Sequence, residues 1–289
     1  MRGTTLILSA AVLWGTTGTA QALGPDATTP LGVGSVRIIL GGSMLFAFAV
    51  IGRRSTNLRW LRHPATLVAA AGMAAYQPAF FSAVDRTGVA VGTLVTIGSG
   101  PIFVGLLETV ITRRPPSRTW LLATAPALAG LITLGLSSGA AEVDTVGVAY
   151  ALLAGFGYAS YAVAASRLAR VGPTHESAGV IFGLAAMLLL PVAAGQNLSW
   201  VVTGPGLAMT AWLGLAATAA AYLLFSAGLR TTHAGTAATL TLAEPVTATI
   251  LGVVVLSERP DAAAWLGVVL IGLGLILARR VPVPATRTA

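Results

Sequence analysis

Two ionisable side chains, Arg37 and Glu244, interrupt long apolar stretches of the 289-residue sequence. A charged side chain at the centre of a membrane helix costs about 2.5–3.5 kcal/mol on insertion scales, so a bundle keeps one only beside a partner or a wet cavity. One interpretation is that Arg37 attracts the carboxylate of a small ligand, while Glu244 receives an ammonium group or a coupling proton. The alternative is that the two side chains, or Arg37 and Asp26, pair and only hold helices together.

Helix-breaking residues lie near these charges at repeated positions. Pro245 follows Glu244 directly, and because proline has no backbone N–H, it leaves a carbonyl free one turn earlier. Residues 98–101, which read Gly-Ser-Gly-Pro, place the same device in the first half of the chain. Interrupted helices at corresponding places predict a binding site at mid-membrane depth, although a simple packing kink gives the same pattern. The predicted helix breaks are Gly98, Gly100, Pro101 and Pro245.

Aromatic and amide side chains recur at helical spacing and predict the wall of such a cavity. Trp14, Thr17 and Gln21 share one helical face, as do Tyr158 and Tyr161. Such rings can contact apolar or aromatic ligand groups while amides fix polar atoms, but aromatic residues at membrane depth also serve as packing or interface anchors. The predicted substrate-binding residues are Trp14, Gln21, Arg37, Tyr76, Gln77, Phe80, Ser99, Tyr158, Tyr161 and Glu244.

The residues needed for catalysis, metal binding or ATP hydrolysis are not arranged for those tasks. The chain has no cysteine, and His63, His175 and His233 are dispersed in or beside loops. No phosphate-binding loop occurs, and the loops are too short for a catalytic domain. Residues 96–100, Thr-Ile-Gly-Ser-Gly, resemble a potassium filter but lie within a full-length span, whereas a filter needs a re-entrant loop. We therefore predict no catalytic residues, metal site or cofactor.

The elements that must position these residues are membrane helices. The composition is 55% hydrophobic and only 9% charged, whereas roughly a quarter of the residues in soluble domains are charged. Apolar runs of about twenty residues fit helices, because hydrocarbon offers no partners to an open backbone. The sequence predicts an all-α membrane protein with ten transmembrane helices, at about 4–23, 31–51, 64–84, 89–111, 119–138, 146–166, 176–195, 207–228, 234–257 and 262–278.

The chain is a tandem duplication. A shift of about 144 residues places the F-S-A-x-x-R-T segment at 81–87 on the same letters at 225–231, and Pro101 on Pro245. Each half, residues 1–145 and 146–289, reads as a repeat of five spans. An odd number of spans turns the second copy upside down relative to the first, and such inverted repeats are typical of secondary transporters.

The basic residues predict the orientation. With the N-terminus inside, 14 of the 17 basic residues fall on cytoplasmic segments, while the outer loops hold acidic residues. The positive-inside rule then places both termini in the cytoplasm, so the net charge of +8 marks orientation and not a nucleic-acid partner. Arginine without lysine, beside much alanine and glycine, suggests a GC-rich bacterial genome. Ala20-Gln21-Ala22 has the form of a signal-peptide cleavage site, but cleavage there would leave the repeats unequal, so we expect the first helix to be retained.

Several short motifs in the second half are shared with a known family. They are L-A-E-P-V at 242–246, S-E-R-P at 257–260, W-L-G at 265–267 and G-L-G at 272–274, while Trp14-Gly15 and Arg37 fit the first half. With the duplication, the whole chain resembles EamA-type members of the drug/metabolite transporter superfamily, and within them the amino-acid exporter branch. The resemblance implies a ten-helix bacterial inner-membrane transporter that exports amino acids, related metabolites or drugs without hydrolysing ATP. One departure is that residues 112–115 read T-R-R-P, so the acidic residue of this turn exists in one copy only.

These observations predict a secondary transporter that exports small metabolites, in the first place aromatic or neutral amino acids, by alternating access at a midplane cavity between the repeats. Its partners would be a small-molecule substrate and the lipid bilayer, and the oligomeric state is not predicted. A proton-coupled multidrug effluxer with Glu244 as proton carrier is the alternative within this class. A membrane scaffold or enzyme subunit is the alternative of another class, although the sequence has no cluster of His, Asp or Glu at one membrane face.

Overall fold

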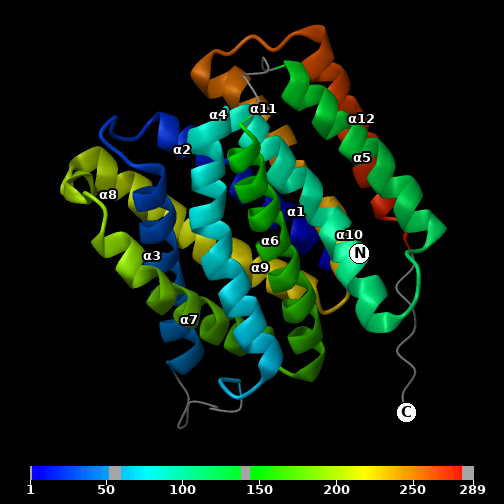
Figure 1. Ribbon diagram of the computed structural model, residues 1–289, viewed down its shortest axis with the longest axis horizontal. Coiled ribbons are helices and arrows are strands. Elements are labelled where there is room, and N and C mark those ends of the chain that lie inside the picture. Colours follow the sequence, from blue (N-terminus) through cyan, green and yellow to red (C-terminus); the bar gives the residue numbers. More distant parts are fainter. Residues whose placement is uncertain (1, 52–59, 138–143, 282–289) are drawn as a thin grey trace.

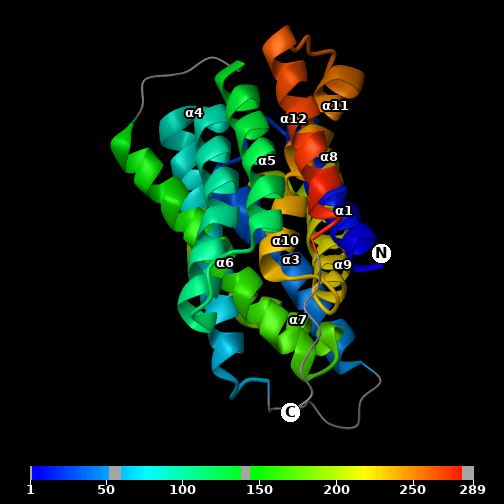
Figure 2. The same cartoon turned by 90° about the vertical axis from the view of Figure 1, so that its right-hand side faces the viewer.

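The computed structural model describes residues 2–51, 60–137 and 144–281, and the regular elements in these ranges are all helical. The first half contains α1 (Arg2–Gly15), α2 (Thr17–Ala22), α3 (Pro30–Val50), α4 (Pro64–Thr112) and α5 (Arg118–Ser137). The second half contains α6 (Thr145–Val171), α7 (Thr174–Ala194), the 3-10 helix η1 (Ser199–Val202), α8 (Gly204–Ala211), the π-helix η2 (Trp212–Ala220), α9 (Ala221–Gly228), α10 (Ala234–Leu240), α11 (Ala243–Leu256) and α12 (Ala262–Ala278). Figures 1 and 2 show them as one bundle of tilted helices, which confirms the predicted all-helical class.

Eight helical stretches of the described residues are long and apolar enough to cross a membrane. They match the second to ninth predicted spans, with α8, η2 and α9 running together over Gly204–Gly228, and α10 and α11 over Ala234–Leu256. The helix α12 is apolar but has 17 residues, and α1 with α2 covers the first predicted span in two pieces that meet at Thr16. Helical segments therefore occupy every predicted range, while ten crossings remain a prediction.

The helix α4 contains two predicted spans with no loop between them. Its backbone leaves the helical region at Gly88, where φ is 79° and ψ is 161°, a conformation that glycine adopts without a steric penalty. The interruption predicted at Gly98, Gly100 and Pro101 is wrong, because α4 continues as a helix to Thr112 with Pro101 inside it. A proline removes one backbone hydrogen bond, and the packing of neighbouring helices can hold a membrane helix straight across that loss.

The connections gather at two opposite ends of the bundle. At one end, Trp60 Nε1 donates to Glu176 Oε2 over 3.0 Å, which joins the start of α4 to the start of α7. At the other end, Thr29 Oγ1 and Gln196 Oε1 lie 2.8 Å apart, between the start of α3 and the segment after α7. Figure 1 shows the α2–α3 and α11–α12 connections at this second end, away from the C-terminal ends of α4 and α6.

These two ends differ in charge, and we call them the arginine-rich end and the acidic end. The described charged residues of the arginine-rich end are Arg2, Arg62, Arg113, Arg114, Arg118, Arg167, Arg170, Arg230, Arg279 and Arg280, together with the carboxylates Glu108 and Glu176. Those of the acidic end are Asp26, Asp85, Arg86, Asp144, Glu258, Arg259 and Asp261. Arg53, Arg54, Arg59, Glu142 and Arg287, which the sequence also assigned to the two sides, lie outside the described residues. The separation has the form of the positive-inside rule, and the cytoplasmic position of the arginine-rich end remains a prediction.

The two halves pack through matched pairs of helices. The main contacts join α4 to α6, α3 to α7, α5 to α12 and α1 to α9. The repeat shift exchanges α3 with α7 and α5 with α12, and it carries the α1–α9 contact onto that between α6 and the first part of α4. The packing therefore has the two-fold pattern expected of a duplicated chain.

Glycine pairs let the backbones of the two halves touch. A Cβ on Gly130 of α5 would lie 2.5 Å from the carbonyl oxygen of Gly267 in α12, and a Cβ on Gly267 would lie 2.7 Å from that of Gly130. The same mutual approach joins α4 to α6 and α1 to α9, through the pairs Gly72–Gly157 and Gly3–Gly228. Small residues suit this task because lipid gives no hydrophobic driving force between helices. Van der Waals packing between closely spaced backbones must hold the helices together instead.

The turns that end α4 and α11 are conformational copies of each other. Arg113 and Ser257 follow these helices and have φ values of 55° and 60°, a left-handed conformation uncommon for residues other than glycine. The two positions coincide under the shift of 144 residues, and one inserted residue in the second turn then brings Arg114-Pro115 onto Arg259-Pro260. Arg113 lies at the arginine-rich end and Ser257 at the acidic end, so equivalent turns lie at opposite ends of the bundle.

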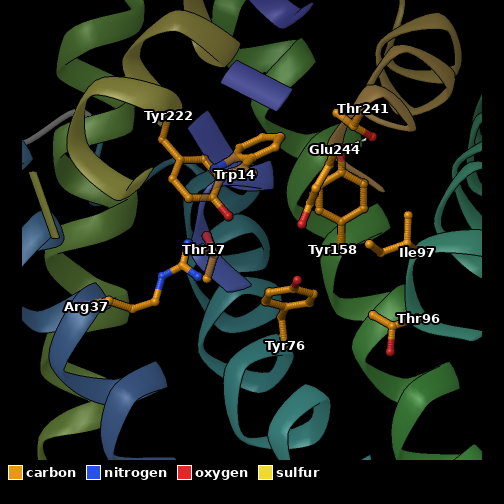
Figure 3. A pocket seen from close by; sticks show the side chains of 10 residues that line it. All are labelled: Trp14, Thr17, Arg37, Tyr76, Thr96, Ile97, Tyr158, Tyr222, Thr241 and Glu244. Carbon is orange, nitrogen blue, oxygen red and sulfur yellow. Dashed lines mark hydrogen bonds between the residues drawn. The ribbon is translucent and has the colours of Figure 1, made fainter. Parts of the chain in front are cut away.

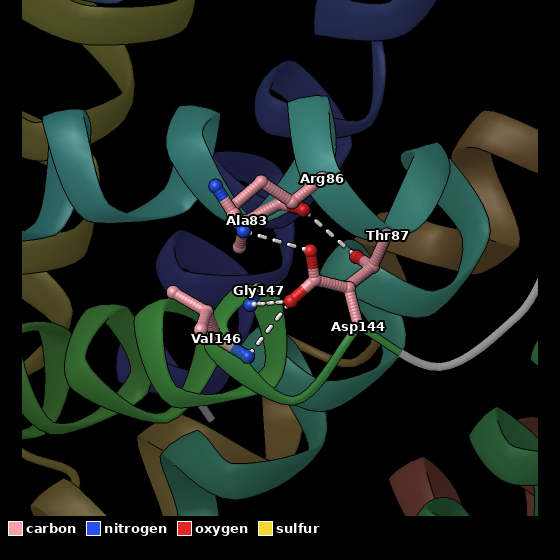
Figure 4. A network of polar contacts seen from close by, with 6 residues as sticks. All are labelled: Ala83, Arg86, Thr87, Asp144, Val146 and Gly147. Carbon is pink, nitrogen blue, oxygen red and sulfur yellow. Dashed lines mark hydrogen bonds and ion pairs between the residues drawn. The ribbon is translucent and has the colours of Figure 1, made fainter.

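Asp144 fastens the start of α6 to the first part of α4 at the acidic end (Figure 4). Its Oδ1 accepts hydrogen bonds from the backbone N–H groups of Val146 and Gly147, over 2.8 and 3.1 Å. Its Oδ2 lies 3.0 Å from Nη2 of Arg86. The Gly147 N–H is the largest of the contacts that lower the pKa of the Asp144 carboxyl, followed by the Val146 N–H and Arg86.

We predict that Gly267→Val lowers the thermal stability of the protein more than Gly272→Val on the same helix. The valine at 267 must push α12 away from Gly130, and overpacking of this kind costs about 1–3 kcal/mol. A Cβ on Gly272 would meet nothing within 4 Å, so that variant controls for the change in helix propensity. Thermal unfolding of both variants in one detergent measures the difference, and equal melting temperatures would show that the glycine contact does not hold α5 and α12 together.

We also predict an acid-dependent loss of stability that Asp144→Asn reduces. Because the pKa of Asp144 is lowered in the folded protein, its stabilisation is present above the unfolded value of about 3.9 and is lost as pH falls below it. Asparagine still caps the helix but does not titrate, so its melting temperature should depend less on pH between about 3 and 5. Asp85→Asn, one residue before Arg86, is the control, and identical pH profiles for all three proteins would contradict the assignment.

Candidate functional site

A cavity lies inside the bundle, between the two halves of the chain (Figure 3). The centres of water-sized spheres can occupy about 50 Å³ of it, which is several times the ~10–15 Å³ that one water needs. The first half contributes α1, α2, α3 and α4, and the second contributes α6, α9, the segment that joins α10 to α11, and the first turn of α11. The lining residues are Trp14, Thr17, Arg37, Tyr76, Thr96, Ile97, Tyr158, Tyr222, Thr241 and Glu244.

Arg37 reaches this cavity from α3 and is anchored on the π-helix η2. Only 8% of the residue is exposed. Its Nε donates to Thr218 Oγ1 and its Nη2 to the carbonyl oxygen of Ala217, both over 3.3 Å. The winding of η2 is wider than that of an α-helix, and π-helical stretches are rare and often lie at functional sites. A guanidinium has five N–H donors, so two bonds to η2 leave donors for the cavity.

Glu244 lies on the other side of the cavity, in the first turn of α11. The helix begins there because Thr241 and Leu242 form a tight turn after α10, in which the Glu244 N–H bonds to the Thr241 carbonyl oxygen over 2.9 Å. Pro245 is the third residue of α11. Because proline has no backbone N–H, it cannot continue the series of backbone hydrogen bonds that runs through α10. In the described part of the chain the Glu244 carboxylate has no hydrogen bond or ion pair, and Arg37 pairs with neither Glu244 nor Asp26.

The cavity wall is made of aromatic rings that carry polar groups. The ring centroids of Trp14 and Tyr222 lie 4.9 Å apart, and those of Tyr76 and Tyr158 lie 6.4 Å apart. The Tyr158 hydroxyl reaches Thr241 Oγ1 over 3.4 Å. The buried Nε1 of Trp14 and the Oγ1 of Thr17 have no hydrogen-bond partner among the described residues. The wall therefore combines flat apolar area with polar groups that a ligand can satisfy.

The helix α1 is brought to this site by a glycine. A Cβ on Gly15 would lie 2.7 Å from the Glu244 carbonyl oxygen and 2.5 Å from Cβ of Thr247. Because residue 15 has no side chain, α1 lies directly on α11, and Trp14 next to it enters the cavity.

Of the ten substrate-binding residues predicted from the sequence, the structure brings five together at the cavity. They are Trp14, Arg37, Tyr76, Tyr158 and Glu244. They come from five different helices, so their proximity arises from the tertiary fold and not from local spacing.

The other five predicted residues do not line the cavity. Gln21 Nε2 donates to the Thr17 carbonyl oxygen over 3.3 Å, and Ser99 Oγ donates to that of Thr96 over 3.1 Å. Gln77 is 1% exposed and lies against Gly34 of α3. The last two pack within the aromatic core: Phe80 stacks on Tyr76 at 5.8 Å, and Tyr161 is fully buried with its ring 6.0 Å from Phe225.

The cavity also contains residues that were not predicted as ligand contacts. Ile97 and Thr241 coincide under the repeat shift of 144 residues, and each lies four residues before a proline, Pro101 or Pro245. This matched spacing before a proline could have identified both positions from the sequence. Thr17 shares the helical face of Trp14, whereas Thr96 and Tyr222 had no comparable signal beyond a polar group in an apolar span.

The described residues contain no group of three or more His, Asp or Glu that could hold a metal ion. The site is thus a buried, polar and aromatic cavity with one basic and one acidic side chain, which suits binding of a small dipolar molecule more than bond-breaking chemistry.

Comparisons with known proteins define the class. The model of the EamA-like transporter family matches residues 1–136 and again residues 145–280. The chain therefore belongs to the EamA-like transporter family, as a transporter and not an enzyme, and it contains two copies of the family's repeat.

Among its relatives, the uncharacterized transporter YwfM of Bacillus subtilis is 41% identical over 276 residues, which cover 96% of this chain and 93% of that protein. The threonine/homoserine exporter RhtA of Escherichia coli is 28% identical over 280 residues, covering 94% and 88% of the two chains. One solved crystal structure matches the fold with a TM-score of 0.79 at 24% identity, over 96% of each chain.

Proposed function

We propose that this protein exports small amino acids across the bacterial inner membrane as a secondary transporter. The observation that carries the proposal is that Arg37 and Glu244 line one cavity and do not pair with each other. An unpaired charge is costly inside a membrane bundle, and a zwitterion offers one complementary charge to each side chain.

In this proposal the cargo carboxylate binds the Arg37 guanidinium, whose position is fixed by Thr218 and Ala217 of η2. The cargo ammonium group binds the Glu244 carboxylate. The free donor of Trp14 and the hydroxyl of Thr17 satisfy further polar atoms of the cargo, and the tyrosine rings contact its side chain. The similarity to RhtA, which is named a threonine/homoserine exporter, supports a small neutral amino acid as cargo.

Transport follows from alternating access between two inverted halves, residues 1–145 and 146–289, with ten crossings and both termini in the cytoplasm. The two matches to the family model and the equivalent turns at opposite ends of the bundle support this arrangement.

We predict that reconstituted protein catalyses saturable counterflow of small neutral amino acids, and that Arg37→Met and Glu244→Gln each reduce it at least about tenfold. Each substitution nearly preserves size but removes one charge. Arg37→Met leaves the cargo carboxylate without a partner, and Glu244→Gln leaves the cargo ammonium group without one. Arg118→Met and Glu258→Gln, at exposed positions of the two ends, are the matched controls and should transport normally.

Counterflow in proteoliposomes with a radiolabelled amino-acid panel makes this measurement. The absence of saturable flux for every amino acid would reject the cargo. Efflux of cationic dyes that needs a pH gradient and is lost in Glu244→Gln would instead support the multidrug alternative, in which Glu244 carries a proton.

A further inference from the structure

The short helix α10 fills the bundle between the cavity and the arginine-rich end. All seven of its residues are buried, and it is packed against α1, α4, α5, α6 and α12. Its C-terminal neighbour Thr241 lines the cavity, while its N-terminal neighbour His233 lies beside Arg170 at the arginine-rich end. The helix α10 therefore runs from the cavity to that end.

The N-terminus of α10 has no cap of its own. The preceding residue, His233, makes no side-chain hydrogen bond to the helix, and its Nε2 is buried without a partner in the described structure. Burial, followed by the positive charge of Arg170, lowers the pKa of His233, so this side chain is neutral at pH 7. It therefore cannot balance the partial charges on the N-terminal N–H groups.

A carboxylate from the other half of the chain takes this role. Glu108 lies near the end of α4, and its carboxylate faces the backbone N–H groups of Ala234 and Gly235. Gly235 permits the approach, because a Cβ there would lie only 3.2 Å from Glu108 Oε2 and 3.1 Å from Trp120 Nε1. A negative charge at a helix N-terminus is favourable, since the helix dipole and the unpaired N–H groups both attract it.

The charged groups around Glu108 come from the elements packed on α10. Arg167 and Arg170 of α6 attract its carboxylate, and His233 is the titratable side chain next to α10. One carboxylate of the first half thus faces the start of α10 and is attracted by the arginines of α6, at the arginine-rich end of the bundle.

The opposite end of α10 is a break in the helix that touches the cargo site. Thr241 and Leu242 separate α10 from α11, and both Thr241 and Glu244 line the cavity. Only three residues, 241–243, therefore separate Glu244 from the last residue of α10.

The equivalent place in the second repeat is built differently. The shift of 144 residues puts Gly252 where the first repeat has Glu108, and the space beside Gly252 is taken by the Glu258 side chain from the turn after α11. The carboxylate contact to a helix start is therefore specific to the arginine-rich end among these two places.

We propose that α10 is the gate of the cavity toward the arginine-rich end and that Glu108 is the latch that holds it closed. The proposal rests on the alternating-access part of the proposed function and does not depend on the identity of the cargo. Releasing Glu108 from α10 opens the cavity toward the arginine-rich end and, by the same equilibrium, closes it toward the acidic end.

The absence of cysteine from the chain makes a direct test possible. A single-cysteine reporter, Ile97→Cys, places a thiol on the cavity wall, and a membrane-impermeant maleimide is applied from either side of sealed membranes. A second reporter, Arg118→Cys, is exposed at the start of α5 and identifies the side on which the arginine-rich end lies. The rates are compared for the Ile97→Cys reporter alone, with Glu108→Gln, and with the control Glu258→Gln.

We expect Glu108→Gln to raise the labelling rate from the arginine-rich side about tenfold, and to lower the rate from the acidic side, because one charge–dipole contact is lost. Glu258→Gln should change neither rate. Unchanged rates in Glu108→Gln would overturn the latch, and so would higher rates from both sides, because these indicate a loosened fold instead of a shifted gate. If no protein is ever labelled from the arginine-rich side, alternating access itself fails, and with it the transport mechanism proposed above.

Discussion

A charge inside a membrane bundle persists only where the protein itself replaces water around it. For Arg37 this is done in two ways: Thr218 and Ala217 of the π-helix η2 accept from the guanidinium, and the cavity receives its remaining donors. Glu244 has the cavity alone. The π-helix η2 and the cavity beside it thus both serve to accommodate buried charge. A fully packed contact between the halves would leave both charges unsolvated.

Away from the cavity, several contacts between the halves bring backbone directly against backbone. The Gly130–Gly267 and Gly72–Gly157 pairs leave no room for a side chain, whereas Trp14, Tyr76 and Tyr222 hold the helices apart at the centre. The small residues fix how far the halves can approach each other. The large rings leave a space at the centre, where the cavity lies.

The parts of this structure that the sequence predicts are those set by local constraints. Hydropathy and span length give the helical class, and the cost of a buried charge singles out Arg37 and Glu244. The boundary between the spans predicted at 64–84 and 89–111 agrees with the break at Gly88, whereas the further break predicted from Gly-Ser-Gly-Pro at 98–101 is absent because helix packing keeps that stretch helical. Gln77 and Tyr161 have suitable chemistry but face α3 and the aromatic core. Which helix face meets the cavity is decided by tertiary contacts, which one-dimensional spacing does not contain.

The two halves share one backbone fold, but the residues in which they differ affect the relative free energies of the states open to either end. Arg113 and Ser257 adopt the same left-handed turn at opposite ends, so the copies agree where conformation is concerned. They differ in charge, since Glu108 faces the start of α10 while Gly252 stands at the equivalent position of α11. If the two copies were identical, the states open to either end would be equally populated, because rotation about the two-fold axis would convert one into the other. Every unmatched contact favours one of them, so the resting state of a duplicated bundle is set by the residues that the copies do not share.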